Sequence, residues 1–232
     1  MPAGDSDVLD KVEVFEAGLG TYWHVYNKRY SPVASNPASE ARLAWRDGSH
    51  GMFYTGATRS AALWETVLRN ASVRRDDVYT DRVHLKNMVL VRLELVAIAD
   101  ILDLRPPYRR AIVTAPSELD EQWDQMLKDP VHKNTHDFTT RAMAQLAAAG
   151  HKDGAALRWY SRMTGSHTAT LFFEPPMKPD WWTYKTEELF HLDSPEGEEQ
   201  IRQALAEQGL RWLAAPVSAD FVPVDGAEGT DT

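Results

Sequence analysis

The irregular order of strand-like and helix-like segments limits which folds this chain can adopt. Short apolar or β-branched runs predict strands at 22–26, 52–55, 87–96, 156–160 and 168–173. Cap residues and four-residue apolar spacing predict helices over about 58–70, 117–127, 138–149 and 194–208. Since no regular strand–helix repeat connects these segments, the pattern favours an α+β fold over a doubly wound parallel sheet.

Composition narrows the classes of function. The 232 residues fit one domain with extensions, and the net charge of −9 disfavours direct binding of nucleic acid. The absence of cysteine excludes disulfides, thiolate catalysis and cysteine-ligated zinc. The sequence contains neither an apolar leader nor a run able to span a bilayer, so we expect a cytoplasmic protein without membrane contact.

The histidines give only a weak indication of a metal site. His132 and His136 are four residues apart and could share a helix face, with Asp137 beside them. No third ligand stands at a usable spacing, and residues 133–135 are polar enough for a solvated helix start. We therefore expect no bound metal. The chain also contains no glycine-rich phosphate loop of a standard kind.

Three segments contain polar side chains suited to chemistry. Glu65 lies in the apolar stretch 61–68, where a carboxylate would be partly buried and would need partners. Arg42 can bind a phosphate or a carboxylate with its fork of N–H donors, and Tyr54 can stack on a ring or donate a hydrogen bond. Ser161 ends an apolar strand. Each residue also has a purely structural interpretation. Glu65 would form a salt bridge, Arg42 would lie at the surface and Tyr54 in the core, and Ser161 would only end its strand.

Several short motifs follow one another in a specific order. They are 22–26 (YWHVY), 36–37 (NP), 41–43 (ARL), 53–54 (FY), 61–66 (AALWET), 139–145 (TTRAMAQ), 153–162 (DGAALRWYSR) and 171–173 (LFF). Each motif alone is weakly specific, but their joint order over residues 20–175 is fairly specific. In this order the chain resembles the RES-domain family, the toxin half of many bacterial toxin–antitoxin pairs.

The resemblance implies a domain organisation and a fold. Residues 1–19 would be a polar N-terminal extension and 20–175 the catalytic domain. Residues 176–224 would be a C-terminal extension packed on the same domain, followed by a disordered acidic tail at 225–232. The fold implied is similar to that of ADP-ribosyltransferases, with a split β core and flanking helices. The C-terminal extension could cover the site, mediate homodimer formation or replace a partner contact.

The resemblance also implies roles for individual side chains. The family is named after an arginine, a glutamate and a serine, and these catalytic positions map to Arg42, Glu65 and Ser161. Residues expected to bind the substrate are His24, Tyr54, Trp159 and Arg162. The chain departs from the family pattern where His24 stands in place of an arginine, and where Ala41 and Leu43 flank Arg42. Because histidine is shorter and mostly neutral at pH 7, this departure would weaken phosphate binding or shift the substrate.

The activity implied is cleavage of the nicotinamide–ribose bond of NAD⁺, which is then a substrate rather than a cofactor. The enzyme would be an NAD⁺ glycohydrolase or, with inorganic phosphate as co-substrate, a phosphorylase. The partner implied is an Xre-type helix-turn-helix antitoxin. Two alternatives remain: an ADP-ribosyltransferase that modifies a protein, and a catalytically degraded binding module. Retention of Glu65, Arg42, Tyr54 and Ser161 argues against the binding module.

Overall fold

The structure is a computed structural model that describes residues 7–17, 19–69, 71–152 and 154–215. The predicted acidic tail at 225–232 lies outside these residues, as do residues 1–6 of the predicted N-terminal extension and residues 216–224 of the C-terminal one.

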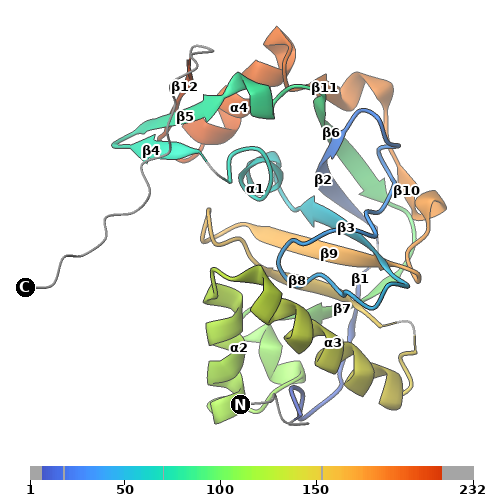
Figure 1. The fold of residues 1–232 in the computed structure, drawn as a ribbon. Coiled ribbons are helices and arrows are strands. Elements are labelled where there is room, and N and C mark those ends of the chain that lie inside the picture. The colour runs from blue at the N-terminus through green and yellow to red at the C-terminus, as the bar shows by residue number, and fades with distance from the viewer. Residues whose placement is uncertain (1–6, 18, 70, 153, 216–232) are drawn as a thin grey trace, which may run out of the picture.

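A nine-stranded mixed sheet forms the centre of the molecule (Figure 1), in the order β1-β7-β8-β9-β3-β2-β6-β10, and β11 also pairs with β6. Its strands are β1 (Phe15–Ala17), β2 (Gly20–Asn27), β3 (Gly51–Gly56), β6 (Met88–Leu95), β7 (Ala99–Asp103), β8 (Ala156–Tyr160), β9 (Thr168–Glu174), β10 (Trp182–Thr183) and β11 (Leu189–His191). A second, three-stranded sheet contains β4 (Ser72–Arg74), β5 (Asp77–Asp81) and β12 (Arg211–Ala215).

Four α-helices flank the sheets: α1 (Arg59–Trp64), α2 (Glu118–Lys128), α3 (His132–Ala148) and α4 (Pro195–Ala206). Short 3₁₀ turns lie at Arg82–His84, Tyr108–Ala111, Pro179–Trp181 and Thr186–Glu188. The expected α+β fold, a β core with flanking helices, is confirmed. Each sheet contains one parallel pair, β7 with β8 in the central sheet and β5 with β12 in the smaller one. The other strand pairs are antiparallel.

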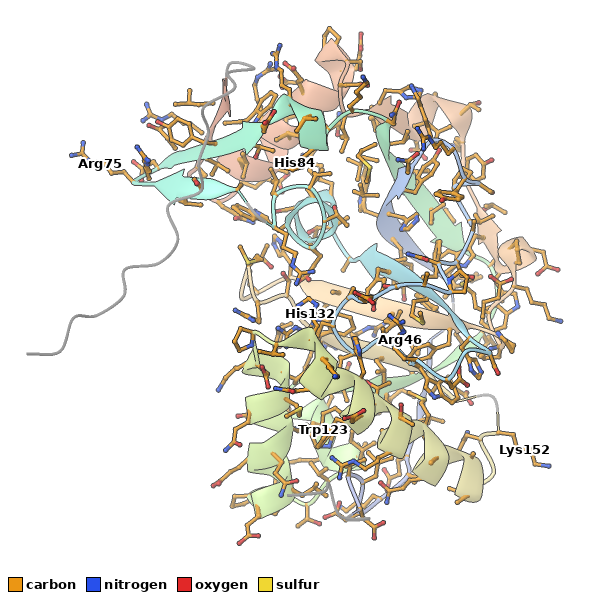
Figure 2. All side chains as sticks on the ribbon, viewed as in Figure 1. Arg46, Arg75, His84, Trp123, His132 and Lys152 are labelled. Atoms are coloured by element: carbon orange, nitrogen blue, oxygen red, sulfur yellow. The ribbon has the colours of Figure 1, made fainter. Side chains whose placement is uncertain are left out.

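Side-chain alternation along the strands divides the core into layers. Leu171 and Phe173 of β9 pack with α2 and α3 on one face, while Phe172 between them points to the other face and contacts Trp182. Trp123 of α2, labelled in Figure 2, is fully buried and packs edge-on against Phe138 of α3. A separate cluster joins α1 and α4 to the smaller sheet.

Helix α1 is shorter than the sequence suggests. Its start is as expected, because the Thr58 hydroxyl accepts a hydrogen bond from the Ala61 amide at 3.1 Å. The prediction that it continues to about residue 70 is wrong, since the α-helix ends at Trp64. There the Thr66 hydroxyl donates to the Ala62 carbonyl at 2.6 Å, and the Leu68 amide donates to the Leu63 carbonyl five residues back. The regular α-helical hydrogen bonding stops here, and Glu65 is the C-cap residue of the helix.

Strands β2 and β3 separate soon after they meet. Their register contains a single residue pair, Trp23 with Gly56. At this point α1 lies so close to the sheet that only glycine fits at position 56. A Cβ atom on Gly56 would lie 2.5 Å from the Ala62 nitrogen. The central sheet is therefore split between β2 and β3.

Candidate active site

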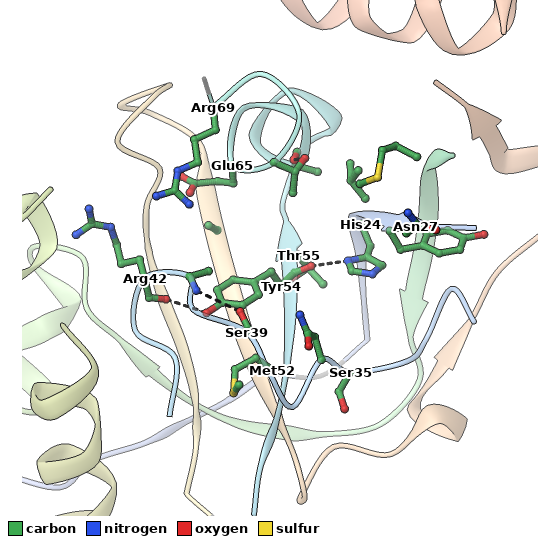
Figure 3. Close-up of a pocket in the computed structure, with 18 of the residues that line it drawn as sticks. His24, Asn27, Ser35, Ser39, Arg42, Met52, Tyr54, Thr55, Glu65 and Arg69 are labelled. Carbon is green, nitrogen blue, oxygen red and sulfur yellow. Dashed lines mark hydrogen bonds between the residues drawn. The ribbon is translucent and has the colours of Figure 1, made fainter. Parts of the chain in front are cut away.

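A cavity of about 740 Å³ opens where β2 and β3 separate. Its walls come from both strands, the long loop 28–50, the end of α1, the junction between α2 and α3, and the turn between β8 and β9. This volume is within the range of small-molecule sites. Of the seven side chains that the sequence indicates, six line the cavity: His24, Arg42, Tyr54, Glu65, Trp159 and Arg162. Figure 3 shows four of them, His24, Arg42, Tyr54 and Glu65, around it.

His24 bridges the split between the strands. Its Nδ1 lies 2.6 Å from the main-chain oxygen of Tyr54. Because a carbonyl only accepts, this ring nitrogen carries the hydrogen. Burial lowers the pKa of His24 to about 4, although the bond to Tyr54 acts in the opposite direction. The imidazole is thus neutral at pH 7, and Nε2 presents a lone pair.

Glu65 is the only acidic side chain in the cavity wall among the described residues. It is half-buried, and its Oε1 atom is buried with no hydrogen-bond partner in the described part of the chain. A carboxylate at the C-terminus of a helix gains nothing from the helix dipole. Its electrostatic neighbours include Arg42 and Tyr54. Glu65 is therefore a carboxylate with unused acceptor capacity facing a cavity.

Arg42 lines the cavity, but much of its guanidinium is used elsewhere. Nη1 donates to the carbonyls of Met126 and Leu127 at 3.0 and 3.1 Å, and Nη2 donates to the carbonyl of Asp129. These are carbonyls at the end of α2 that the helix cannot satisfy itself. Burial, followed by repulsion from Arg162, lowers the pKa of Arg42 from its ordinary value. Arg42 thus anchors loop 28–50 to α2.

Tyr54 fixes the same loop to β3. Its hydroxyl donates to the main-chain oxygen of Arg42 at 2.9 Å, as the dashed line in Figure 3 shows. Burial raises the pKa of Tyr54, partly offset by a hydrogen bond from Ser39. The phenol therefore stays protonated, and its ring forms part of the cavity surface.

The end of β8 contributes two cavity residues and one that lies behind them. Trp159 is 2 % exposed, lines the cavity and has an indole nitrogen without a partner among the described residues. Arg162 also lines the cavity. Ser161 is fully buried and is not part of the cavity surface, and its hydroxyl likewise has no partner among the described residues. Its main chain is held in the hairpin turn by His167 and Gly165 at 2.8 Å each.

In the comparison with protein families, the model described as the RES domain matches residues 21–193. The chain belongs to the RES-domain family. A chain in the crystal structure of the M. tuberculosis MbcT–MbcA toxin–antitoxin complex has a similar fold to this RES protein, with a TM-score of 0.50 and 12% identity. The alignment covers 80% of this chain and 92% of that chain. No curated protein matches this chain.

Two basic residues of the cavity wall, Arg69 and His132, were not predicted as ligand-binding positions. Arg69 lies four residues after Glu65, a spacing that places two side chains on one side of a helical turn and could have indicated it. His132, considered only as a metal ligand, begins α3 and also lines the cavity. A guanidinium nitrogen of Arg69 contacts both ring nitrogens of His132, with Nδ1 at 3.1 Å.

The described part of this RES domain contains neither a group of metal-ligand residues nor a membrane-spanning helix. In the described ranges, no three histidine or acidic side chains are grouped as metal ligands would be. His136, four residues after His132, instead places Nε2 3.0 Å from the Ala41 carbonyl. Among the described helices, none is both long enough and apolar enough to cross a bilayer.

Proposed function

We propose that this RES-domain protein degrades NAD⁺ by cleaving the bond between nicotinamide and ribose. Water or inorganic phosphate takes the ADP-ribosyl group, which makes the protein a glycohydrolase or a phosphorylase. With water the products are nicotinamide, ADP-ribose and one proton. With phosphate they are nicotinamide and an ADP-ribosyl phosphate.

The observation that carries this proposal is the Glu65 carboxylate, which has an unpartnered oxygen at the wall of a cavity of ligand size. Departure of nicotinamide leaves positive charge on the ribose, as in glycoside hydrolysis. A carboxylate placed in advance beside the developing charge stabilises it without reorganisation. Nicotinamide leaves as a neutral molecule, so the reaction needs neither a strong general acid nor a metal.

The other cavity residues fit supporting roles. The rings of Tyr54 and Trp159 provide surfaces on which nicotinamide can stack. The lone pair on His24 Nε2 can accept a hydrogen bond from a carboxamide or a ribose hydroxyl. Ser161 lies outside the cavity surface, so we assign it to holding Trp159 and Arg162 in position. Arg42 acts in the same way through loop 28–50.

Product analysis distinguishes the forms of this reaction. The purified protein is incubated with NAD⁺, with and without inorganic phosphate, and the products are identified by chromatography and mass spectrometry. Free ADP-ribose indicates a glycohydrolase, and an ADP-ribosyl phosphate indicates a phosphorylase. ADP-ribose covalently attached to protein would replace the proposal with a protein ADP-ribosyltransferase. Binding without turnover would favour a degraded binding module.

We further infer that the protein is the toxin of a cytoplasmic toxin–antitoxin pair, with an Xre-type antitoxin over the cavity mouth. Apolar side chains at the mouth support such a partner. Tyr30 and Met163 line the cavity and are 69% and 41% exposed, and Val131, between two lining residues, is 52% exposed. Exposed apolar side chains grouped around a cavity are typical of contact surfaces.

A further inference from the structure

The cavity has two ends of different electrostatic character. Figure 3 shows Arg42 and Arg69 at one end, with Glu65 beside Arg69, and His24 with Asn27 at the other end, with Tyr54 between them. Arg162 belongs to the first end, since its charge acts on Arg42. In a chain of net charge −9, three arginines against one carboxylate, Glu65, leave a local positive potential at this end. An elongated ligand with one anionic part would bind in one direction only.

Position 24 cannot supply positive charge to a ligand. The His24 ring is 8% exposed, and its Nδ1 hydrogen is committed to the Tyr54 carbonyl. Protonation of the ring is opposed by its burial. Arg42 is also limited, because three main-chain carbonyls already take its donors on the α2 side.

Arg69 has most of its donors unused. It is exposed at the cavity wall, and within the described residues one nitrogen of its guanidinium contacts the imidazole of His132. Figure 3 shows Arg69 beside Glu65, but the buried Oε1 of Glu65 accepts no hydrogen bond from it. Arg162, across the same end, makes one long contact of 3.4 Å with the Asp129 carbonyl. Both side chains can therefore turn donors toward a ligand.

We propose that Arg69, together with Arg162, binds the diphosphate of the dinucleotide. This assignment rests on the proposed function and deepens it. The nicotinamide end of the ligand then lies toward the neutral end of the cavity, near His24.

The test is calorimetric binding of ADP-ribose, inorganic pyrophosphate and nicotinamide to the wild-type protein, Arg69→Gln, Arg69→Lys and Arg162→Gln. Arg75→Gln is the matched control, because Arg75 is exposed at the β4–β5 turn (Figure 2) and is not part of the cavity wall. Thermal unfolding of each variant verifies that it is folded. Loss of one charged hydrogen-bond donor corresponds to roughly a 10- to 100-fold loss of affinity.

We expect Arg69→Gln to raise the Kd for ADP-ribose and for pyrophosphate by at least about 10-fold. The affinity of Arg69→Gln for nicotinamide should be unchanged. Arg69→Lys should regain part of the affinity for the two phosphate ligands, and Arg75→Gln should bind all three ligands like the wild type. Equal affinities for Arg69→Gln and Arg75→Gln would overturn the assignment, as would failure of the wild type to bind either phosphate ligand. Pyrophosphate binding that depends on Arg69, without any NAD⁺ turnover, would instead support the anion site and refute the proposed function.

Discussion

At the residue scale, the site is marked by polar atoms that the described chain leaves unsatisfied. Glu65 Oε1, the Trp159 indole nitrogen and the Ser161 hydroxyl all belong to that group. Buried polar groups without partners cost free energy and are uncommon in folded proteins. Two of the three, on Glu65 and Trp159, belong to the cavity wall, where a bound ligand can supply the missing partner. The sequence marks Glu65 and Ser161 by residue type and setting, and Trp159 through motif order, but it cannot show which atoms lack partners, because hydrogen-bond satisfaction depends on the folded surroundings.

His24 gives a pH-dependent contribution to stability that belongs to this single residue. Its pKa falls from 6.5 in the unfolded chain to about 4 in the folded one. As the pH drops below 6.5, the unfolded chain takes up the proton first, so stability is lost between pH 6.5 and about 4 and is fully retained above 6.5. The difference corresponds to about 3 kcal/mol.

Substitution of His24 by glutamine should remove this contribution, since an amide can still donate to the Tyr54 carbonyl but does not titrate. We expect the free energy of unfolding, measured with urea at a series of pH values, to fall less steeply from pH 6.5 to 4 in His24→Gln than in the wild type. Parallel pH curves for the two proteins would show that His24 is not the group responsible.

At the element scale, the sequence predicted those helices and strands that are determined by neighbouring residues, such as cap residues, apolar spacing and β-branched runs. The cap residue Ser117 correctly placed α2, and the runs at 156–160 and 168–173 became β8 and β9. The apolar spacing found α3, but that helix begins at His132, six residues before the predicted start at 138. Strand β7 was not predicted, because it depends on pairing with β8 more than fifty residues later. The early end of α1 also escaped prediction, since it depends on the Thr66 hydroxyl and on packing.

Arg42 connects two elements, and its replacement should mainly affect stability. A lysine cannot reproduce the fork that reaches the carbonyls of Met126, Leu127 and Asp129. We expect Arg42→Lys to lower the free energy of unfolding by roughly 2 kcal/mol. The neighbouring substitution Arg46→Lys, at a side chain that is 40% exposed, should change it by less than about 0.5 kcal/mol. Equal effects in urea unfolding would show that the bonds to α2 contribute little.

At the scale of the whole molecule, the α+β class could be predicted from the order of segments, whereas the way the chain ends pack could not. Residues 182–191 add β10 and β11 to the edge of the central sheet, and α4 packs against α1. These contacts join segments more than eighty residues apart, so they leave no periodic signal in the sequence. The division at residue 175 stays a prediction. The spacing of Arg69 from Glu65 could be read from the sequence, but its contact with His132 depends on the approach of α3.

The C-terminal helix should be necessary for the stability of the whole domain. Leu205 of α4 is fully buried in the cluster that contains Leu63 and Leu68 next to Glu65. We expect Leu205→Ala to cost roughly 2–4 kcal/mol, because it removes buried methyl groups and leaves a cavity. Leu213→Ala is the matched control, since that leucine is 42% exposed and should cost less than about 1 kcal/mol. Urea unfolding that is insensitive to Leu205→Ala would place α4 outside the cooperative unit.

The central claim is that Glu65 stabilises the positive charge formed when nicotinamide leaves NAD⁺, and the most direct test is the rate of NAD⁺ loss with matched carboxylate variants. Glu65→Gln retains the size of the side chain and removes its charge. Glu121→Gln, at an exposed position on α2 away from the cavity wall, removes the same charge elsewhere. With thermal unfolding confirming that both variants fold, we predict that Glu65→Gln lowers kcat by at least about 100-fold and that Glu121→Gln turns over NAD⁺ like the wild type. Full turnover by Glu65→Gln would contradict the account.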